Sequence, residues 1–378
     1  MSAEAIMSLI SSAAQPGDTL AALDTPSLIL DLDAFEDNLK TMQALAEHHG
    51  VALRPHAKAH KCADIAQRQI ALGAQGICCQ KVTEAAAFIA AGITDIHISN
   101  EIVGASKIGL LARLAKHAQL SVCVDHIQPL KSLSEALVAQ DAQMGIFVEI
   151  DLGQQRCGVQ TIEEAVKLAQ ATAALPNVWL KGVQAYHGGI QHERSHEARY
   201  QASQAAAQRV QEVIDAIAKV GLECPVITGA GTGTALFDVA SGVYTEIQPG
   251  SYAFMDNDYG QLEWGEGATF QHSLFVLGTV MSVPTPTRAI VDVGLKSTTA
   301  ESGLPRPYGL TGVTCTGLHD EHTMLDADKS VHRPPLGSLV KLVPGHCDPT
   351  FNLHDTVVVM RGDTVEALWP ITARGLSR

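Results

Sequence analysis

The chain has 378 residues, of which 46% are hydrophobic and 17% are charged, so it is long enough for one large domain and a smaller second one with a substantial core. The formal net charge of −14 argues against a nucleic-acid or anionic-membrane partner, because either surface would require clustered Lys and Arg. The same composition excludes disordered and fibrous classes.

The opening segment, MSAEAIMSLISSAAQPGDTLA, has a short apolar patch but no basic region before it, so we do not expect a signal peptide. No run elsewhere approaches the roughly 18 uninterrupted apolar residues of a membrane-spanning helix. The eight cysteines are scattered without a compact framework, and we expect them to be reduced. These features predict a cytoplasmic protein with no membrane or nucleic-acid partner.

From residue 26 onward, short β-rich runs alternate with Ala-rich helical stretches. Eight runs are expected as strands: 27–33, 52–60, 75–80, 95–100, 121–125, 145–153, 180–189 and 225–231. Amphipathic helices are expected between them, for example over 33–50, 81–92 and 196–221, the last ending at Gly221. This rhythm predicts a closed parallel (β/α)8 barrel. A doubly wound open sheet is the alternative, and it would place the site at one crevice. Polar residues at the ends of at least five runs favour the closed barrel, in which the strand ends surround the site.

After about residue 265 the helical periodicity disappears. The runs QHSLFVLGTVMSV, RAIVDVG, SLVKLVPG, TVVVMRGD and TVEALWPI read as strands separated by turn signals. The sequence therefore predicts a barrel over 26–264 and a second, mostly antiparallel β-rich domain made of 1–25 and 265–378.

The stretch VALRPHAKAHK, residues 51–61, places cationic side chains at alternate positions: Arg54, His56, Lys58 and His60. In a strand these four share one face, which in a barrel would line the site at the strand's end. A lysine crowded by cations and partly desolvated becomes a neutral nucleophile, suited to a Schiff base. An edge strand with its polar face in water is the simpler alternative.

A glycine-rich turn, ITGAGTGT, follows the run at 225–231. Its successive backbone N–H groups, with hydroxyls from Thr228, Thr232 and Thr234, could cradle a phosphate. The spacing fits neither a dinucleotide fingerprint nor a P-loop. Together with an inward lysine, the loop points to pyridoxal phosphate, although a Gly-rich loop alone is weak support.

In VPGHCDPT, His346 and Asp348 are two residues apart, so in an extended segment they would point the same way and could hold one divalent ion, with Cys347 pointing away. A turn with a hydrogen-bonded histidine is the alternative. Polar residues also follow two barrel runs, where loops face one mouth: Arg156, Tyr186, His187 and His192.

Ten pieces of the chain resemble the D-threonine aldolase family over nearly its whole length: DTPSLILDLDAFEDNL, RPHAKAHK, GICCQKVTEA, HISNEIVG, EIDLGQQRCGV, QAYHGGIQH, GAGTGT, YTEIQPGSYAFMDNDYG, VDVGLKSTTAE and LVPGHCDPTFNLHD. That family belongs to the alanine racemase-like, fold type III pyridoxal phosphate enzymes. The resemblance implies a barrel followed by a β domain and a homodimer.

The resemblance also implies site residues. Lys58 matches the lysine that carries the cofactor, Arg156 the arginine at its phenolic oxygen, and His192 a histidine near the substrate hydroxyl. Gln248 falls where alanine racemases place an arginine beside the pyridine nitrogen. The remaining cofactor contacts are expected from Tyr186, Thr228, Gly231, Thr232, Gly233, Gly250 and Ser251, and the metal ligands from His346 and Asp348.

The implied activity is a metal-dependent retro-aldol cleavage of D-threonine and related D-β-hydroxy-α-amino acids to glycine and an aldehyde. Mn is the expected metal, with Mg, Co or Zn as alternatives. Three other activities stay open: a D-3-hydroxyaspartate aldolase, a D-serine or D-3-hydroxyaspartate dehydratase, and a non-catalytic pyridoxal phosphate-binding protein. The dehydratases resemble a His-x-Cys metal pair, whereas this chain reads His-Cys-Asp.

Overall fold

In the computed structural model, which describes residues 13–378, the chain divides into two compact units. The barrel unit comprises Asn38–Tyr252, Gln261–Phe270 and Thr372–Arg378. The β unit comprises the described residues up to Asp37 with Ala253–Gly260 and Gln271–Ile371. Residues 1–12, which include the apolar patch of the opening segment, lie outside the described residues.

The barrel unit contains eight parallel strands in the order β2-β9-β8-β7-β6-β5-β4-β3. The strands are β2 (Ala52–Leu53), β3 (Ile77–Cys79), β4 (Asp95–Glu101), β5 (Gln119–Val124), β6 (Met144–Glu149), β7 (Val178–Ala185), β8 (Val226–Gly229) and β9 (Glu246–Ile247). The two ends of the sheet meet, because Cys78 N donates to Pro55 O at 2.8 Å and His56 forms a parallel bridge with Cys78. The predicted (β/α)8 barrel is confirmed.

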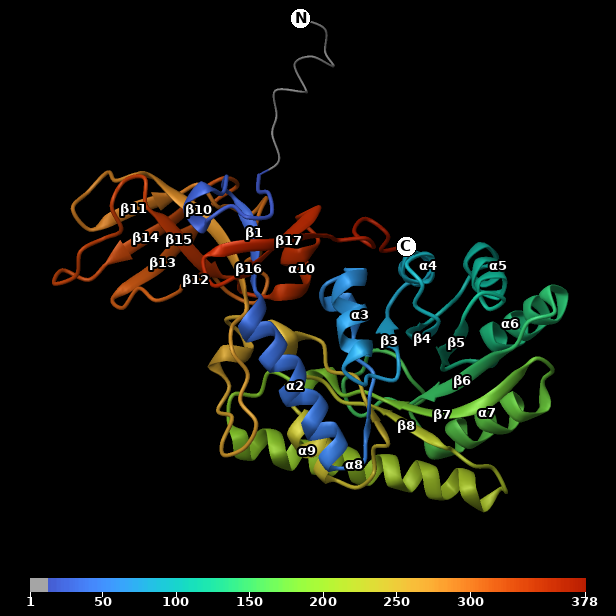
Figure 1. The fold of residues 1–378 in the computed structure, drawn as a ribbon. Coiled ribbons are helices and arrows are strands. Elements are labelled where there is room, and N and C mark those ends of the chain that lie inside the picture. The colour runs from blue at the N-terminus through green and yellow to red at the C-terminus, as the bar shows by residue number, and fades with distance from the viewer. Residues whose placement is uncertain (1–12) are drawn as a thin grey trace, which may run out of the picture. The chain divides into compact units, whose positions relative to one another are not determined.

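Helices follow or precede each barrel strand and lie along the outer side of the sheet (Figure 1). They are α2 (Leu32–His48), α3 (Ala63–Ala71), α4 (Val82–Ala90), α5 (Ala105–Leu114), α6 (Ile127–Gln140), α7 (Ile162–Ala174), α8 (His196–Lys219) and α9 (Ala235–Ala240). Helix α8 buries one stripe that includes Val210, Val213 and Ile217, and the chain leaves it through Gly221 at φ +79°. The helix predicted over 196–221 and its glycine end are therefore confirmed.

Two strand assignments from the sequence are wrong. The run 27–33 forms β1 (Ser27–Asp31), which pairs with strands of the β unit and not with the barrel. The eighth barrel strand is β9, which the sequence pattern missed. The buried apolar residues Leu28–Leu30 of β1 would fit the middle of either sheet, and the two-residue strand β9 is too short to show any periodicity.

The boundaries of the two compact units differ from the predicted domain boundaries at both ends of the barrel unit. Residues from 26 to Asp37 belong to the β unit with β1. Thr372–Arg378 belongs to the barrel unit, where Ala373 N donates to Lys61 O at 2.9 Å. Pairing between segments far apart in the chain decides both assignments, and such pairing leaves no local signal.

The β unit holds a nine-stranded sheet that is antiparallel except for the pair β1 and β16. Its other strands are β10 (Leu274–Ser282), β11 (Arg288–Val291), β12 (Arg306–Pro307), β13 (Val313–Leu318), β14 (Thr323–Ala327), β15 (Leu339–Val343), β16 (Thr356–Arg361) and β17 (Thr364–Pro370). The short helix α10 (Cys347–Phe351) follows β15. One core cluster joins Ile29, Phe275, Val343 and Val358. The five predicted runs and the mostly antiparallel character are confirmed.

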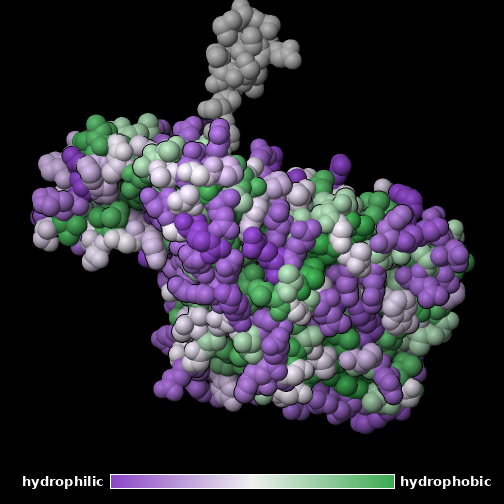
Figure 2. All heavy atoms as spheres, viewed as in Figure 1, coloured by the Kyte–Doolittle hydropathy of each residue, from purple (hydrophilic) through white to green (hydrophobic). Residues whose placement is uncertain are grey.

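The visible face of each unit carries hydrophilic residues interspersed with hydrophobic ones (Figure 2). Within residues 13–378, no helix combines the length and the apolar composition that crossing a bilayer would require.

Candidate active site

Lys58 lies at the carboxyl end of the first barrel strand, but in a turn and not in a strand. Strand β2 ends at Leu53, and Lys58 is the middle residue of the 3-10 turn η2 (Ala57–Ala59). Pro55 cannot donate to a neighbouring strand, and His56 Nδ1 accepts from Lys58 N, which favours the turn. The predicted strand over 52–60 is therefore wrong beyond His56, whereas the position of Lys58 at the strand-end edge of the barrel holds.

The histidines on either side of Lys58 are engaged by the protein. His56 Nε2 lies 2.9 Å from Ser99 Oγ and 3.0 Å from Gln80 Nε2. Burial, followed by the charge of Lys58, lowers the pKa of His56, so its ring is neutral near neutral pH. His60 Nδ1 accepts from Cys62 N at 3.0 Å. Both rings thus shape the chain around Lys58.

Arg54 is a structural cation, a role that the sequence left open. Its side chain is fully buried, with Nε 2.8 Å from Glu246 Oε2 and Nη1 2.7 Å from Asp95 Oδ1. These ion pairs join the chain beside β2 to strands β9 and β4. The four alternating cations therefore do not form one ligand-binding face.

A row of neutral polar groups crosses the barrel interior. Gln248 Nε2 donates to Gln184 Oε1 at 2.9 Å and to Thr228 Oγ1 at 2.7 Å. Gln184 Oε1 lies 3.2 Å from His97 Nε2, and burial lowers the pKa of His97 to about 3. Gln248 therefore contributes an uncharged amide to this row of polar groups, and Gln184 links it to the neutral imidazole of His97.

The glycine-rich loop between β8 and α9 packs closely against Gln191, a residue that the sequence analysis missed. A Cβ on Gly231 would lie 2.4 Å from Gln191 Oε1, and one on Gly233 would lie 2.1 Å from Gln191 O. Gln191 Oε1 also accepts from Gly233 N at 3.1 Å. Only glycine fits these two positions, and the loop presents backbone and the buried Thr232 hydroxyl without larger side chains. Such a cradle fits a phosphate group.

Three segments meet at this end of the barrel. His56 N donates to Pro249 O at 3.0 Å, and a Cβ on Gly250 would lie 3.0 Å from His56 O. Tyr252 N donates to Thr232 Oγ1 at 3.0 Å. The Lys58 turn, the segment with Gly250 and Ser251, and the glycine-rich loop are thus in successive contact, which fits a cofactor with an aldehyde and a phosphate.

Asp238 supports the glycine-rich loop through hydrogen bonds, and its ionisation should make the stability of the fold depend on pH. Its buried carboxylate accepts from Thr234 Oγ1 at 2.5 Å and from Ser203 Oγ at 2.7 Å. Burial raises its pKa to about 6, against the opposing effect of these two hydrogen bonds. As pH rises from about 4 to about 6, the unfolded chain loses this proton while the folded chain keeps it, so the free energy of unfolding falls by about 3 kcal/mol.

We expect Asp238→Asn to remove this loss, because an amide does not ionise in this range. The measurement is urea unfolding of both proteins from about pH 4 to about pH 7. Asp215→Asn, an exposed substitution on α8, serves as the control. A stability difference between wild type and Asp238→Asn that stays constant with pH would contradict this account.

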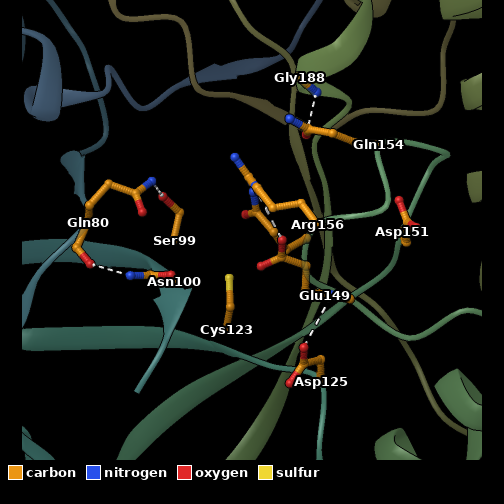
Figure 3. Close-up of polar contacts among 12 residues, drawn as sticks. Gln80, Ser99, Asn100, Cys123, Asp125, Glu149, Asp151, Gln154, Arg156 and Gly188 are labelled. Carbon is orange, nitrogen blue, oxygen red and sulfur yellow. Dashed lines mark hydrogen bonds and ion pairs between the residues drawn. The ribbon is translucent and has the colours of Figure 1, made fainter. Parts of the chain in front are cut away.

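Side chains at the ends of β3 to β6 converge around Arg156 (Figure 3). Asp151 shapes the loop that carries Arg156 by accepting from Gly153 N at 2.9 Å and Gln155 N at 3.1 Å. The Arg156 guanidinium lies 5.5 Å from the centre of the Tyr186 ring, and its Nη2 lies 3.9 Å from Glu149 Oε1. The structure therefore brings Arg156 and Tyr186 together.

His192 lies in the exposed segment between η3 (Gly188–Ile190) and α8. His187, which precedes η3, is half-buried, and burial lowers its pKa. Gln154 Oε1 accepts from Gly188 N at 3.0 Å, so the loops after β6 and β7 are joined. His192 thus belongs to the connection between β7 and α8, which is joined to the Arg156 loop at Gly188.

His346 and Asp348 lie close together in the β unit. His346 Nε2 is 3.6 Å from Asp348 Oδ1, and His346 Nδ1 is 2.7 Å from Glu301 Oε2. The segment is not extended as predicted: His346 precedes the first turn of α10, and Cys347 is buried with its thiol 3.3 Å from Asp348 Oδ1. One imidazole and carboxylates form a donor set that suits Mn, Zn or Co. Within residues 13–378, no group of three or more His, Cys, Asp or Glu is already arranged to hold a metal.

Known proteins match nearly the whole chain. The alanine racemase N-terminal domain family matches residues 30–258, and a domain family named for serine dehydratases matches residues 273–360. A D-threonine aldolase from an Arthrobacter species is 55% identical over 365 residues, which cover 97% of this chain and 96% of the relative. A 3-hydroxy-D-aspartate aldolase from Paracoccus denitrificans strain Pd 1222 is 45% identical over 369 residues, 96% of this chain and 95% of the relative.

Among solved structures, the D-threonine aldolase from Filomicrobium marinum superposes with a TM-score of 0.96 at 46% identity. The superposition covers 97% of this chain and 100% of that one. The similarity therefore extends through the residues of both units.

Proposed function

Because this chain belongs to the D-threonine aldolase family of alanine racemase-like pyridoxal phosphate enzymes, we propose that it cleaves D-threonine and related D-β-hydroxy-α-amino acids to glycine and an aldehyde. It is a carbon–carbon lyase that uses pyridoxal phosphate and a small-molecule amino acid. The observation that carries the proposal is the contact between the Lys58 turn, the Gly250 segment and the glycine-rich loop, which together suit the cofactor's aldehyde and phosphate.

The residues of the barrel unit are assigned to the cofactor. Lys58 holds it covalently, and Gln248 places an uncharged amide beside its ring nitrogen. Bound pyridoxal phosphate supplies an electron sink for the electron pair left when the Cα–Cβ bond breaks. The assigned phosphate and ring contacts are Thr228, Gly231, Thr232, Gly233, Gly250, Ser251, Arg156 and Tyr186.

Two further groups are assigned to the substrate's β-hydroxyl. His192 removes the hydroxyl proton as general base, a role worth about 10²–10⁴ in rate. His346 and Asp348 hold a divalent cation, with Mn preferred over Mg, Co or Zn, and such a cation supplies Lewis-acid stabilisation of an alkoxide.

The assembly and location belong to the same proposal. We assign a homodimer from the family resemblance. All eight cysteines lie in the described residues and remain thiols, which supports a reducing compartment such as the cytoplasm.

The first test is product analysis after incubation of the purified protein with D-threonine, pyridoxal phosphate and Mn²⁺, with and without chelator. Glycine and acetaldehyde that disappear on chelation are the expected result. 2-Oxobutyrate and ammonia would instead indicate a dehydratase, and no product from any D-β-hydroxy-α-amino acid would indicate a cofactor-binding protein without turnover.

The similarity to a 3-hydroxy-D-aspartate aldolase favours a second substrate. Comparison of kcat/KM for D-threonine and 3-hydroxy-D-aspartate separates the two assignments. A higher kcat/KM for D-threonine than for 3-hydroxy-D-aspartate supports the proposal. A much lower value for D-threonine would instead assign the chain the hydroxyaspartate activity.

A further inference from the structure

Two carboxyl groups face each other at the ends of β4 and β6: Glu149 is buried, and Glu101 is half-buried with its Oε1 shielded from solvent. Glu149 is 5% exposed and hydrogen-bonds Glu101, the last residue of β4. Strand β5 lies between β4 and β6, and its residue Cys123 is the register partner of Glu101. The thiol of Cys123 hydrogen-bonds Glu149. Glu149, Cys123 and Arg156 point toward one another in Figure 3. This acidic pair has no assigned role in the proposed reaction.

Two carboxylates cannot both be ionised at hydrogen-bonding distance in a buried site without a large cost, so such a pair keeps a proton. Among the described residues, no hydrogen-bond donor reaches the buried Oε1 of Glu101. A proton on Glu149, whose side chain hydrogen-bonds Glu101, would add a donor to the pair. Burial, followed by the charge of Glu101, raises the pKa of Glu149, in agreement with this geometry.

Of the other titratable groups that the structure describes around the pair, only Arg156 carries a charge near neutral pH, as the following pKa shifts and distances show. Burial raises the pKa of Cys123 and raises that of Cys157, which lies beside Glu101, to about 11, so both thiols are neutral near neutral pH. Arg156 contributes the positive charge, with Nη2 3.9 Å from Glu149 Oε1. His97, 3.6 Å from Cys123 Sγ, is neutral.

We propose that Glu101 and Glu149 share a single proton, so that the pair presents one negative charge to Arg156 and holds its guanidinium against the ring of Tyr186. The pair is a positioning device and touches no reacting atom. Arg156 is half-exposed and not in hydrogen-bond contact with Glu149, so it keeps donors for a ligand. A second negative charge would draw the guanidinium into the pair and away from that ligand.

The proposal rests on the proposed function where it concerns the cofactor, but the shared proton is testable on its own. The probe is the infrared band of a protonated carboxyl group in the full chain without cofactor at about pH 8, above the pKa values of the other buried acids described above. Isosteric Glu101→Gln and Glu149→Gln are compared with the exposed Glu163→Gln control.

We expect the band in wild type and in Glu163→Gln, and its loss in either single variant, because a single carboxylate that faces an amide and has Arg156 nearby should be ionised at about pH 8. Absence of the band in wild type would overturn the shared proton. Persistence in Glu101→Gln would also overturn it, since burial alone would then keep Glu149 protonated.

The positioning role is tested by the dissociation constant of pyridoxal phosphate. Each single variant keeps one negative charge, so we expect less than about a threefold change, whereas the double variant Glu101→Gln/Glu149→Gln should weaken binding about three- to tenfold. In a background of Arg156→Lys, which cannot make the same planar contacts, the double variant should add little.

An equal loss in both backgrounds would assign the pair a merely structural role and overturn the positioning. Thermal unfolding of each variant controls for folding. If wild type binds no pyridoxal phosphate, the proposed function fails while the infrared result on the shared proton stands.

Discussion

Replacement of Lys58 by alanine is expected to lower the aldolase activity by at least about a thousandfold, because the residue that we propose as the covalent anchor of the cofactor is lost. The turn that carries Lys58 should survive, since its cap is the imidazole of His56 and its neighbours Ala57 and Ala59 are already buried alanines. The free energy of unfolding without cofactor should therefore change little.

The measurement is borohydride reduction of the protein with pyridoxal phosphate, followed by fragment mass spectrometry of the peptide that contains residues 52–61. In wild type the added mass should lie on Lys58 and not on Lys61, whose Nζ is 3.1 Å from Glu84 Oε1 in a buried ion pair. Lys81→Met, also at the end of a barrel strand and half-buried, is the matched control and should keep the label on Lys58. Label on another lysine would remove Lys58 from its assigned role.

Much of this barrel edge could be predicted because its chemistry is local in sequence. The polar residues that end each run, the lysine after the first barrel strand and the glycines at 229, 231 and 233 all lie within short motifs. Parallel strands bring such motifs to one edge whatever the lengths of the intervening helices. Lys58 was therefore located correctly even though its strand ends five residues earlier.

The features that the sequence did not predict depend on partners far apart in the chain. Gln191 fits the glycine-rich loop 40 residues later, and Glu101 meets Glu149 across 48 residues. Strand β1 joins the β unit because its partner β16 lies more than 300 residues away. Buried carboxylates and amides also look like ordinary surface residues in a sequence, since their cost and their role appear only once their neighbours are known.

Arg54 is the clearest example of a residue whose role depends on partners far away in the chain. Arg54→Met is expected to destabilise the barrel unit by about 3–5 kcal/mol. The substitution keeps a side chain of similar length but leaves Glu246, which is 2% exposed, as an uncompensated buried carboxylate. Asp95 is 23% exposed and can turn to solvent, so Glu246 carries most of the cost. The hydrogen bond from Thr228 Oγ1 to Glu246 Oε1, at 2.8 Å, remains and cannot offset a full charge.

The double variant Arg54→Met/Glu246→Gln isolates that cost. The amide removes the stranded charge and can still accept from Thr228, so we expect the double variant to be more stable than Arg54→Met alone. Unfolding in urea, followed by circular dichroism, measures both. Arg288→Met, which breaks a partly exposed arginine–aspartate pair in the β unit, is the control and should have a much smaller effect. If the double variant were less stable than Arg54→Met, the destabilisation would come from lost packing around the arginine stem and not from the buried carboxylate, and Arg54 would act as a spacer between β2, β4 and β9 instead of a counter-charge.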